Sequence, residues 1–324
     1  MTEIENLRET LARIAKMAQS AGDGATAEGE HNGSNGHDMV EADVPGCTVK
    51  TLPRRLLVKA AATAVKINPV NAPAIAPTAA ASDLGVMDPL RLSVLTAKYW
   101  GPAPRRLTVS FTESTASDLR SRIVSHMNAW TRTACISFVE TRGVGQVRIS
   151  RAGSGYWSYL GTDILLIPRN RPTMNLQGFT MNTPESEYKR VVRHETGHTL
   201  GFPHEHMRKS LIARIDPAKA YEWFLRTQGW DRATVDAQVL TPLDERSLMS
   251  TPADQTSIMC YQLPASITKD GMPITGGINI NATDFAFAGR IYPKPGSAPT
   301  AAEHMDDPAE SEEWAESEDI EVAA

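Results

Sequence analysis

The chain has 324 residues, a hydrophobic fraction of 41% and a formal net charge of −5, which suits one large domain or two modest ones with a real core. No apolar run approaches the roughly 20 residues that a membrane-spanning helix needs, and three cysteines are too few for a disulfide framework. Ten acidic residues fall in the last 24 positions, so the rest of the chain is slightly basic, but no clustered basic helix favours nucleic-acid binding.

Residues 1–45 are expected to form a flexible segment with one short amphipathic helix, whose apolar residues are Ile4, Leu7, Leu11 and Ile14. No apolar stretch there is typical of a secretory signal, so we expect a cytoplasmic protein or one exported by a leaderless route. Residues 46–93 mix basic, apolar and Pro/Ala-rich runs, which fits a pro-segment or a linker. Residues 294–324 are expected to be an acidic, disordered tail.

The middle of the chain, residues 94–293, alternates strand and helix patterns and is expected to be one domain. Short runs of β-branched and aromatic residues predict strands over 106–111, 135–140, 146–150, 156–160 and 163–168. Helices are predicted over 115–130, from Pro184 onward with Thr183 as N-cap, over 216–229 with Asp216 as N-cap, and over 282–292. Strands packed with helices, then a more irregular second half, predict an α+β fold.

The segment HETGHTLGFPHEH holds four of the eight histidines. Side chains four residues apart leave the same face of an α-helix, so His194 and His198 can reach one metal ion. Glu195 lies about 100° round the helix and can reach a water molecule on that ion, which is the H-E-x-x-H arrangement of zinc proteases. Gly201 can close the helix in the left-handed conformation, after which His204 can return to the same ion.

The complete pattern H-E-x-x-H-x-x-G-x-x-H is the metzincin signature, and its surroundings resemble the astacin family. HEHMR continues past the third ligand, SIMCY at 257–261 resembles the astacin Met-turn, and SGYWSYLG at 154–161 resembles the substrate-side edge of the sheet. The resemblance covers roughly residues 94–293. It implies a metzincin-like catalytic domain with a twisted, mostly parallel sheet, a long active-site helix, and a more irregular C-terminal subdomain that holds the Met-turn.

The resemblance also implies one catalytic zinc ion and a role for each residue around it. Met259 would lie beneath the zinc, Glu205 would be structural through a bond to a new N-terminus, and His206 would stay outside the site. The predicted metal ligands are His194, His198, His204 and Tyr261.

These assignments predict a zinc-dependent metalloendopeptidase that hydrolyses internal peptide bonds. Zinc would lower the pKa of a bound water toward about 7 and polarise the scissile carbonyl. Glu195 would act as general base on that water, and Tyr261 would swing away from zinc to hydrogen-bond the oxyanion. We therefore expect protein or peptide substrates, no nucleic-acid partner, no membrane span and a monomer, with the cleavage preference left open.

The chain departs from the astacin pattern mainly at its cysteines. Tyr156 replaces the cysteine of the edge segment and Cys135 lacks a partner near the C-terminus, so the two usual disulfides are expected to be missing. Cys260 replaces the Met-turn histidine, as a small buried residue or an extra ligand. The astacin pro-segment motif F-x-G-D is missing, and Cys47 is either a thiolate plug on the zinc, as in matrixin pro-segments, or an incidental cysteine.

Two alternatives stay open at the level of function. The domain could be catalytically silent and bind zinc or peptide as an interaction module, which the intact Glu195 disfavours. It could also be a leaderless toxin or effector protease, although the acidic tail and N-terminal segment suit a self-processed cytoplasmic enzyme equally well.

Overall fold

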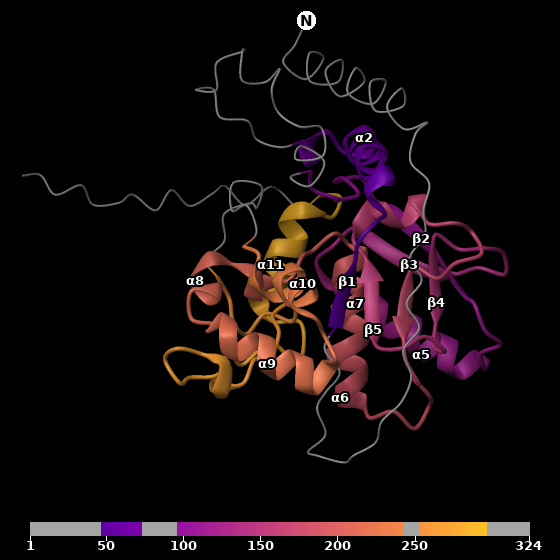
Figure 1. The fold of residues 1–324 in the computed structure, drawn as a ribbon. Coiled ribbons are helices and arrows are strands. Elements are labelled where there is room, and N and C mark those ends of the chain that lie inside the picture. The colour runs from indigo at the N-terminus through magenta and orange to yellow at the C-terminus, as the bar shows by residue number, and fades with distance from the viewer. Residues whose placement is uncertain (1–46, 73–95, 243–252, 297–324) are drawn as a thin grey trace, which may run out of the picture.

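The computed structural model describes residues 47–72, 96–242 and 253–296. The helix predicted over residues 4–14 and the acidic residues after 300 lie outside these ranges. Figure 1 shows a half made of a sheet with its helices, a half made of short helices and loops, and strand β1 running between them. The α+β class and the mostly parallel sheet predicted from the sequence are confirmed.

The sheet has six strands in the order β1-β5-β6-β4-β2-β3. β2 pairs in parallel with β3 and with β4, and β4 pairs in parallel with β6. β5 runs antiparallel to β6 and carries β1 in parallel on its other side. The strands are β1 (Cys47–Lys50), β2 (Arg105–Phe111), β3 (Ile136–Glu140), β4 (Val147–Ser150), β5 (Tyr156–Tyr159) and β6 (Met174–Leu176).

Four of the five predicted strands are confirmed, and the one over 163–168 is wrong. That segment lies in the 3-10 helix η4 (Gly161–Leu166) and the residues after it. Gly161 has a positive φ of 46°, and a Cβ there would overlap the carbonyl oxygen of Lys98. The Thr162 N–H donates to that same carbonyl at 3.0 Å. This close backbone approach turns the chain at a segment whose apolar composition predicted a strand. The next strand is β6, which begins later, at Met174.

The helix before the histidine cluster is one continuous run from Glu185 to Thr199. It comprises α6 (Glu185–Glu187), the π-helical turn η5 (Tyr188–Val192) and α7 (Arg193–Thr199). The predicted cap is wrong, because Pro184 takes the N-cap position with extended backbone and no side chain caps the helix. The hydroxyl of Thr183 instead accepts a hydrogen bond from the Thr180 N–H.

The other three predicted helices are confirmed as α5 with η3, α9 and α11, whereas η6, α8, α10, η7 and η8 were not predicted. Asp216 caps α9 by accepting hydrogen bonds from two backbone N–H groups, and Gly229 ends that helix with a φ of 67°. The predicted helix over 115–130 is α5 continued by a 3-10 turn. These helices are α5 (Ser117–Met127), η3 (Asn128–Arg132), η6 (Glu205–Met207), α8 (Lys209–Ile212), α9 (Pro217–Gln228), α10 (Arg232–Val235), η7 (Asp236–Leu240), η8 (Ala265–Ile267) and α11 (Ala282–Ile291).

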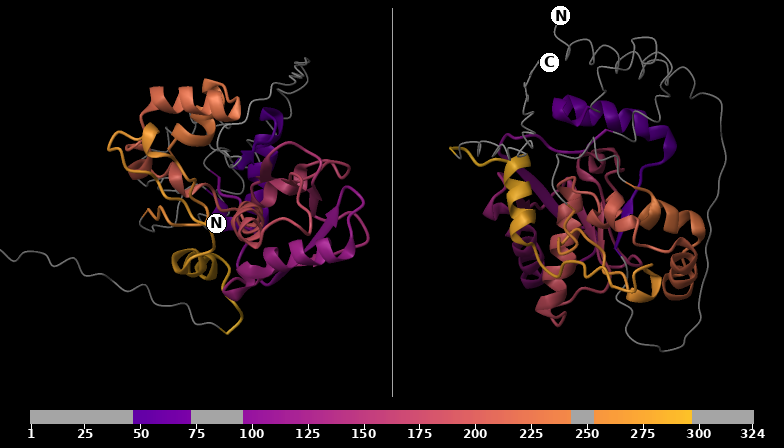
Figure 2. Two further views of the ribbon diagram at one scale, coloured as in Figure 1. Left: turned by 90° about the horizontal axis from the view of Figure 1, so that it is seen from below. Right: turned by 90° about the vertical axis from the view of Figure 1, so that its left-hand side faces the viewer.

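The first described segment packs on the rest of the molecule through β1, η1 (Arg54–Leu56), α2 (Leu57–Ile67) and η2 (Pro69–Asn71). In Figure 1 and in the right-hand view of Figure 2, α2 lies across one end of the sheet half. Asn71 is fully buried, and its amide bonds the carbonyls of Ala64 and Tyr99 and the Tyr99 N–H. Residues 47–72 are therefore anchored on the rest of the molecule at three places: at strand β1, at helix α2 and at the Asn71 side chain.

Two apolar cores meet at the histidine cluster. One contains residues of the sheet, α5 and η5, together with Ile258 and Met259. The other lies in the C-terminal half and contains Cys47, Cys260 and Tyr261. The turn at 257–261 therefore passes from one core to the other beside the histidines. No helix in the described ranges is long and apolar enough to cross a membrane.

Candidate metal and catalytic site

Helix α7 brings His194 and His198 to one side because they are separated by one helical turn. Gly197 lies where the helix meets the turn at 257–261, and a Cβ at this position would overlap the sulfur of Met259. Glycine therefore allows the close approach of helix and turn that sets the histidines against the second core.

A sharp reversal at Gly201 returns the chain to the helix. Gly201 has a φ of 97°, and its N–H donates to the His198 carbonyl at 2.8 Å. A Cβ there would lie 3.0 Å from the carbonyl oxygen of Lys98, so the position favours glycine for its backbone and for space. As a result His204 faces α7, with its Nε2 atom 3.0 Å from Nε2 of His198.

Backbone carbonyls orient the two histidines of α7. The His194 Nδ1 lies 2.6 Å from the Ile258 carbonyl oxygen, and the His198 Nδ1 lies 2.8 Å from that of Phe202. Because carbonyl oxygens only accept, both Nδ1 atoms carry the proton and both Nε2 atoms present a lone pair. The His194 Nε2 is buried and has no hydrogen-bond partner among the described residues.

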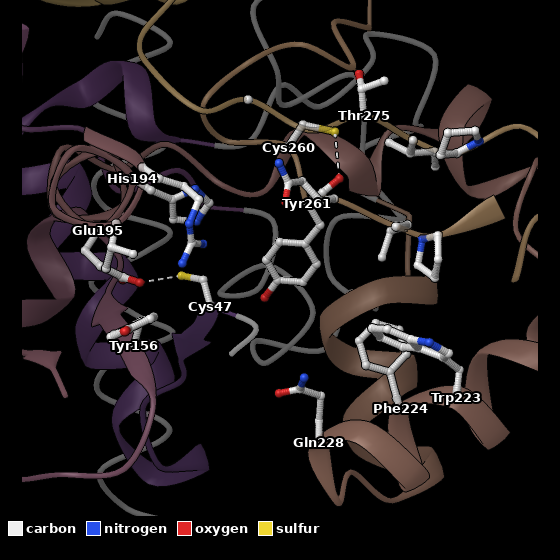
Figure 3. A pocket seen from close by; sticks show the side chains of 18 residues that line it. Cys47, Tyr156, His194, Glu195, Trp223, Phe224, Gln228, Cys260, Tyr261 and Thr275 are labelled. Carbon is white, nitrogen blue, oxygen red and sulfur yellow. Dashed lines mark hydrogen bonds between the residues drawn. The ribbon is translucent and has the colours of Figure 1, made fainter. Parts of the chain in front are cut away.

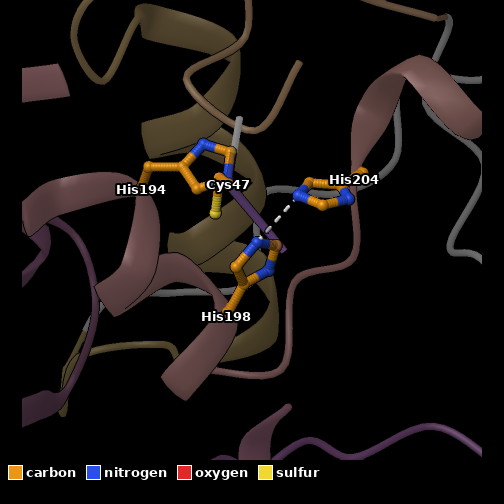
Figure 4. A group of neighbouring side chains, drawn as sticks. All are labelled: Cys47, His194, His198 and His204. Atoms are coloured by element: carbon orange, nitrogen blue, oxygen red, sulfur yellow. Dashed lines mark hydrogen bonds between the residues drawn. The ribbon is translucent and has the colours of Figure 1, made fainter. Parts of the chain in front are cut away.

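The three imidazoles are neutral and converge on one small space. Burial lowers the pKa of His194 to about 4 and holds the pKa values of His198 and His204 well below the usual value. Their ligand atoms and the sulfur of Cys47 all lie within 4.8 Å of one another (Figure 4). Buried, neutral nitrogen donors that face each other fit a zinc ion, which takes histidine ligands and leaves a further position for a reactant.

Glu195 is completely buried and points toward the same space. Its Oε1 accepts a hydrogen bond from the Cys47 thiol at 2.5 Å, and its Oε2 has no partner within the part of the chain that the structure describes. Burial raises the pKa of Glu195 to about 8. Burial and the nearby Glu195 carboxylate raise the pKa of the Cys47 thiol well above its usual range. The glutamate predicted as the base thus lies beside the histidines, with one oxygen available.

Tyr261 comes from the turn on the other side of the histidines. Its ring centroid lies 4.2 Å from that of His204, and its buried hydroxyl has no partner in the described structure. Asp284 holds the turn, since its carboxylate accepts from the Ser257 hydroxyl at 2.6 Å and from the Ile258 N–H at 2.9 Å. Sequence reasoning did not single out Asp284, although the Asn281–Asp284 capping box is visible in the sequence as a helix-start signal.

All three cysteines are free thiols. Cys135 lies at the edge of the sheet, where its thiol donates to the Pro102 carbonyl at 3.4 Å. Cys260 is buried with its sulfur directed at the Tyr261 carbonyl and away from the group of four donors. Only Cys47 reaches that group, so the described geometry favours the buried-residue interpretation of Cys260 and brings the first segment into the site.

His206 lies next to the cluster but faces another element. Its Nε2 donates to the Gln238 carbonyl at 2.9 Å, and its ring stacks on Tyr261 with centroids 4.2 Å apart. The Gln238 side chain in turn bonds both backbone groups of Val49 at 3.2 Å. Sequence reasoning missed Gln238, because a glutamine in an amphipathic helix carries no signal of its own.

Glu205, predicted as structural, lies outside the group of donors. Its Oε1 accepts from the Asp254 N–H at 3.2 Å, and it pairs with Arg208 at 3.2 Å. Burial raises the pKa of Glu205 to about 7. Its contacts tie the histidine loop to the start of the turn at 257–261.

A pocket of about 510 Å³ adjoins His194, Glu195 and Tyr261 (Figure 3). Helix α9 supplies Trp223 and Phe224 to its opposite wall. The pocket is mainly apolar and opens beside the reactive groups. Such a space can receive one side chain of a bound peptide.

Comparisons with known proteins agree on one family. The model described as Astacin (Peptidase family M12A) matches residues 94–275. A zinc metalloproteinase of Caenorhabditis elegans, nas-27, is 32% identical over 99 residues, which are 31% of this chain and only 21% of that protein. The solved structure of myroilysin is 29% identical with a TM-score of 0.57, over 61% of this chain and 96% of that chain. The matched family range contains the whole histidine cluster and Tyr261, whereas Cys47 precedes it.

Proposed function

The chain belongs to the astacin family of peptidases, and from this premise we propose that it is a zinc-dependent metalloendopeptidase that hydrolyses internal bonds of proteins and peptides. The observation that carries the proposal is the convergence of three buried, neutral histidines, a buried glutamate and an unpartnered tyrosine hydroxyl on one space. An apolar pocket opens beside them.

One zinc ion would be held by His194, His198 and His204, with Tyr261 as an additional ligand in the resting enzyme. The oriented Nε2 lone pairs and the low pKa values support this set. When bound, zinc would polarise the scissile carbonyl and lower the pKa of a water molecule toward about 7.

Glu195 would accept the proton of the attacking water and pass one to the leaving amine. Burial supports this role, because a carboxylate whose pKa lies near neutrality is a better base than a solvated one. The Tyr261 hydroxyl would donate to the oxyanion that forms on the scissile carbonyl. Its burial without another partner leaves it available for that bond.

The test is Glu195→Ala in full-length, zinc-loaded protein that also carries Cys47→Ala, so that the thiol no longer holds the glutamate, with casein cleavage and bound metal both measured against Cys47→Ala alone. Removing a general base is expected to lower the cleavage rate by about 10²–10⁴-fold while zinc stays bound, since the histidines are unchanged. Glu185→Ala, at the exposed start of the same helix, is the matched control and should keep both.

The competing function, a silent zinc- or peptide-binding module, makes a different prediction. Such a module would bind zinc in both forms and cleave nothing in either. Protein that binds no zinc would contradict both functions.

We also propose that the full-length chain is latent while β1 occupies the site. The Cys47 sulfur lies among the three histidine donors and its thiol bonds Glu195, so it would take the place of the attacking water and hold the base. Residues 46–93 would then act as a pro-segment, in line with the packing of residues 47–72 on the domain. Activity would require that β1 leave the cleft.

A further inference from the structure

Strand β1 lies between two elements that bind its backbone from opposite sides. On one side it pairs with β5, with Cys47 opposite Tyr156 and Val49 opposite Ser158. On the other side the Gln238 amide accepts from the Val49 N–H and donates to the Val49 carbonyl, both at 3.2 Å. An extended chain in this cleft therefore meets the edge of β5 on one side and the Gln238 amide on the other.

The contact made by Gln238 does not depend on which residue it binds. A side-chain amide has donors and acceptors, as a backbone peptide group does, and can bond both backbone groups of one extended residue. No side chain of the bound segment takes part in it. Because one group donates and the other accepts, the amide can also serve a chain that runs in the opposite direction after a flip of its own plane.

Gln238 is held in place by the site itself. The His206 ring donates to its backbone carbonyl and stacks on Tyr261. The neighbouring Val239 is completely buried in the second core. Helix η7 is thus tied to the histidine loop, so the distance from the reactive groups to Gln238 is fixed by packed side chains.

We propose that Gln238 is a chain-binding residue of the substrate cleft, for β1 in the full-length chain and for the extended peptide that replaces β1 on β5. This rests on the proposed peptidase function. In β1, Gln238 binds the backbone of Val49, which lies opposite Ser158. Val49 is two residues after Cys47, the residue whose thiol bonds Glu195. The residue of a substrate that Gln238 contacts lies two positions from the reactive centre.

The first test follows β1 and needs no activity. In zinc-loaded, full-length protein, the rate of alkylation of Cys47 by iodoacetamide is measured by mass spectrometry in wild type, Gln238→Ala and Asp236→Asn. Loss of both hydrogen bonds is expected to raise the rate by about thirtyfold, since two bonds of about 1 kcal/mol each correspond to that factor. Asp236 begins the helix η7 that carries Gln238, and its carboxylate accepts from the Tyr221 hydroxyl of α9; Asp236→Asn is the control and should leave the alkylation rate unchanged. An unchanged rate in Gln238→Ala overturns the proposal.

The second test follows the substrate. A peptide from casein with a mapped cleavage site is shortened one residue at a time from each end, and is cleaved by chains carrying Cys47→Ala with Gln238 or with Gln238→Ala. Gln238→Ala is expected to raise KM by about thirtyfold for the full peptide with little change in kcat, because the same two hydrogen bonds are lost. The effect should vanish once the residue two positions from the cleaved bond is removed on one side.

Two outcomes separate this inference from the function on which it rests. A loss in Gln238→Ala that is equal for all peptide lengths overturns the inference and leaves the peptidase intact. If no form cleaves any peptide while Gln238→Ala still speeds alkylation, the peptidase proposal fails and the assignment of Gln238 to the bound chain stands.

Discussion

At the scale of single residues, the site contains several buried polar atoms that have no hydrogen-bond partner among the described residues. Folded proteins pair nearly all such atoms, and an exception needs a reason. Of the exceptions among the described residues, the His194 Nε2, the Glu195 Oε2 and the Tyr261 hydroxyl lie around one space. Each would gain a partner when the site binds a metal ion, a water molecule or a substrate carbonyl.

Tyr261→Phe is predicted to impair chemistry without impairing stability. The hydroxyl has no partner to lose, whereas removing an oxyanion donor lowers kcat by about 10²–10³-fold. The measurements are kcat and the melting temperature. Tyr188→Phe is the control, because its hydroxyl donates to the Thr180 carbonyl at 3.0 Å and its loss should lower stability by about 1 kcal/mol. A melting temperature lowered equally in both variants would contradict the prediction.

Asp163 predicts how stability depends on pH away from the histidines. Burial raises its pKa from 3.8 to about 6, although the ammonium of buried Lys98 lies 3.6 Å away. The native state therefore holds this proton more tightly than the unfolded chain, and its contribution to stability falls as pH rises from about 4 to about 6. Denaturant unfolding of wild type and Asp163→Asn should show this fall only in the wild type. Parallel pH profiles would rule it out.

At the scale of elements, the site depends on one close contact between helix α7 and the turn at 257–261. The helix contributes His194, Glu195 and His198, and the turn contributes Met259 and Tyr261. Glycine at 197 lets them touch. Met259 is 4% exposed and packs directly against helix α7 at Gly197, so the helix surface has to leave room for its side chain.

Gly197→Ala is predicted to destabilise the domain by about 1–3 kcal/mol through overpacking. Met259→Ala removes the atom in the way, so the double variant should be more stable than the sum of the two single changes by at least about 1 kcal/mol. Urea unfolding of the four proteins measures this coupling. Gly289→Ala, in α11 and in contact with Thr133, is the control and should show no coupling to Met259→Ala. Additive changes at Gly197 and Met259 would disprove the contact.

At the scale of the whole molecule, the first described segment crosses the boundary between the two halves. It is held at β1, at the Gln238 amide, through α2 and at Asn71. These contacts are spread along 25 residues of chain, so displacing it requires several of them to open. This arrangement suits a segment that covers a reactive site until it is removed.

Cys47→Ala is predicted to relieve latency in the full-length, zinc-loaded chain. Casein cleavage should rise by about tenfold or more over wild type, the factor that corresponds to about 1.4 kcal/mol of lost inhibitory contact. Cys135→Ala, a free thiol at the far edge of the sheet, is the control and should behave as wild type. Equal rates in wild type and Cys47→Ala would contradict the latency proposal.

The sequence by itself determined the local features of this protein. Helical periodicity places His194 and His198 together, glycine at 201 permits the reversal, and Asp216 marks a helix start, because each depends on neighbours within a few residues. Two local predictions were wrong. The Lys98 carbonyl turns the chain at Gly161, so 163–168 is not a strand, and Pro184 takes the N-cap position that was predicted for Thr183. Only the tertiary structure decided what lies beside the histidines: Cys47 from 147 residues upstream of His194, Asp284 behind the turn, and Gln238 across the cleft. Contacts of such long range leave no periodic trace in a chain, since they arise from the packing of whole elements.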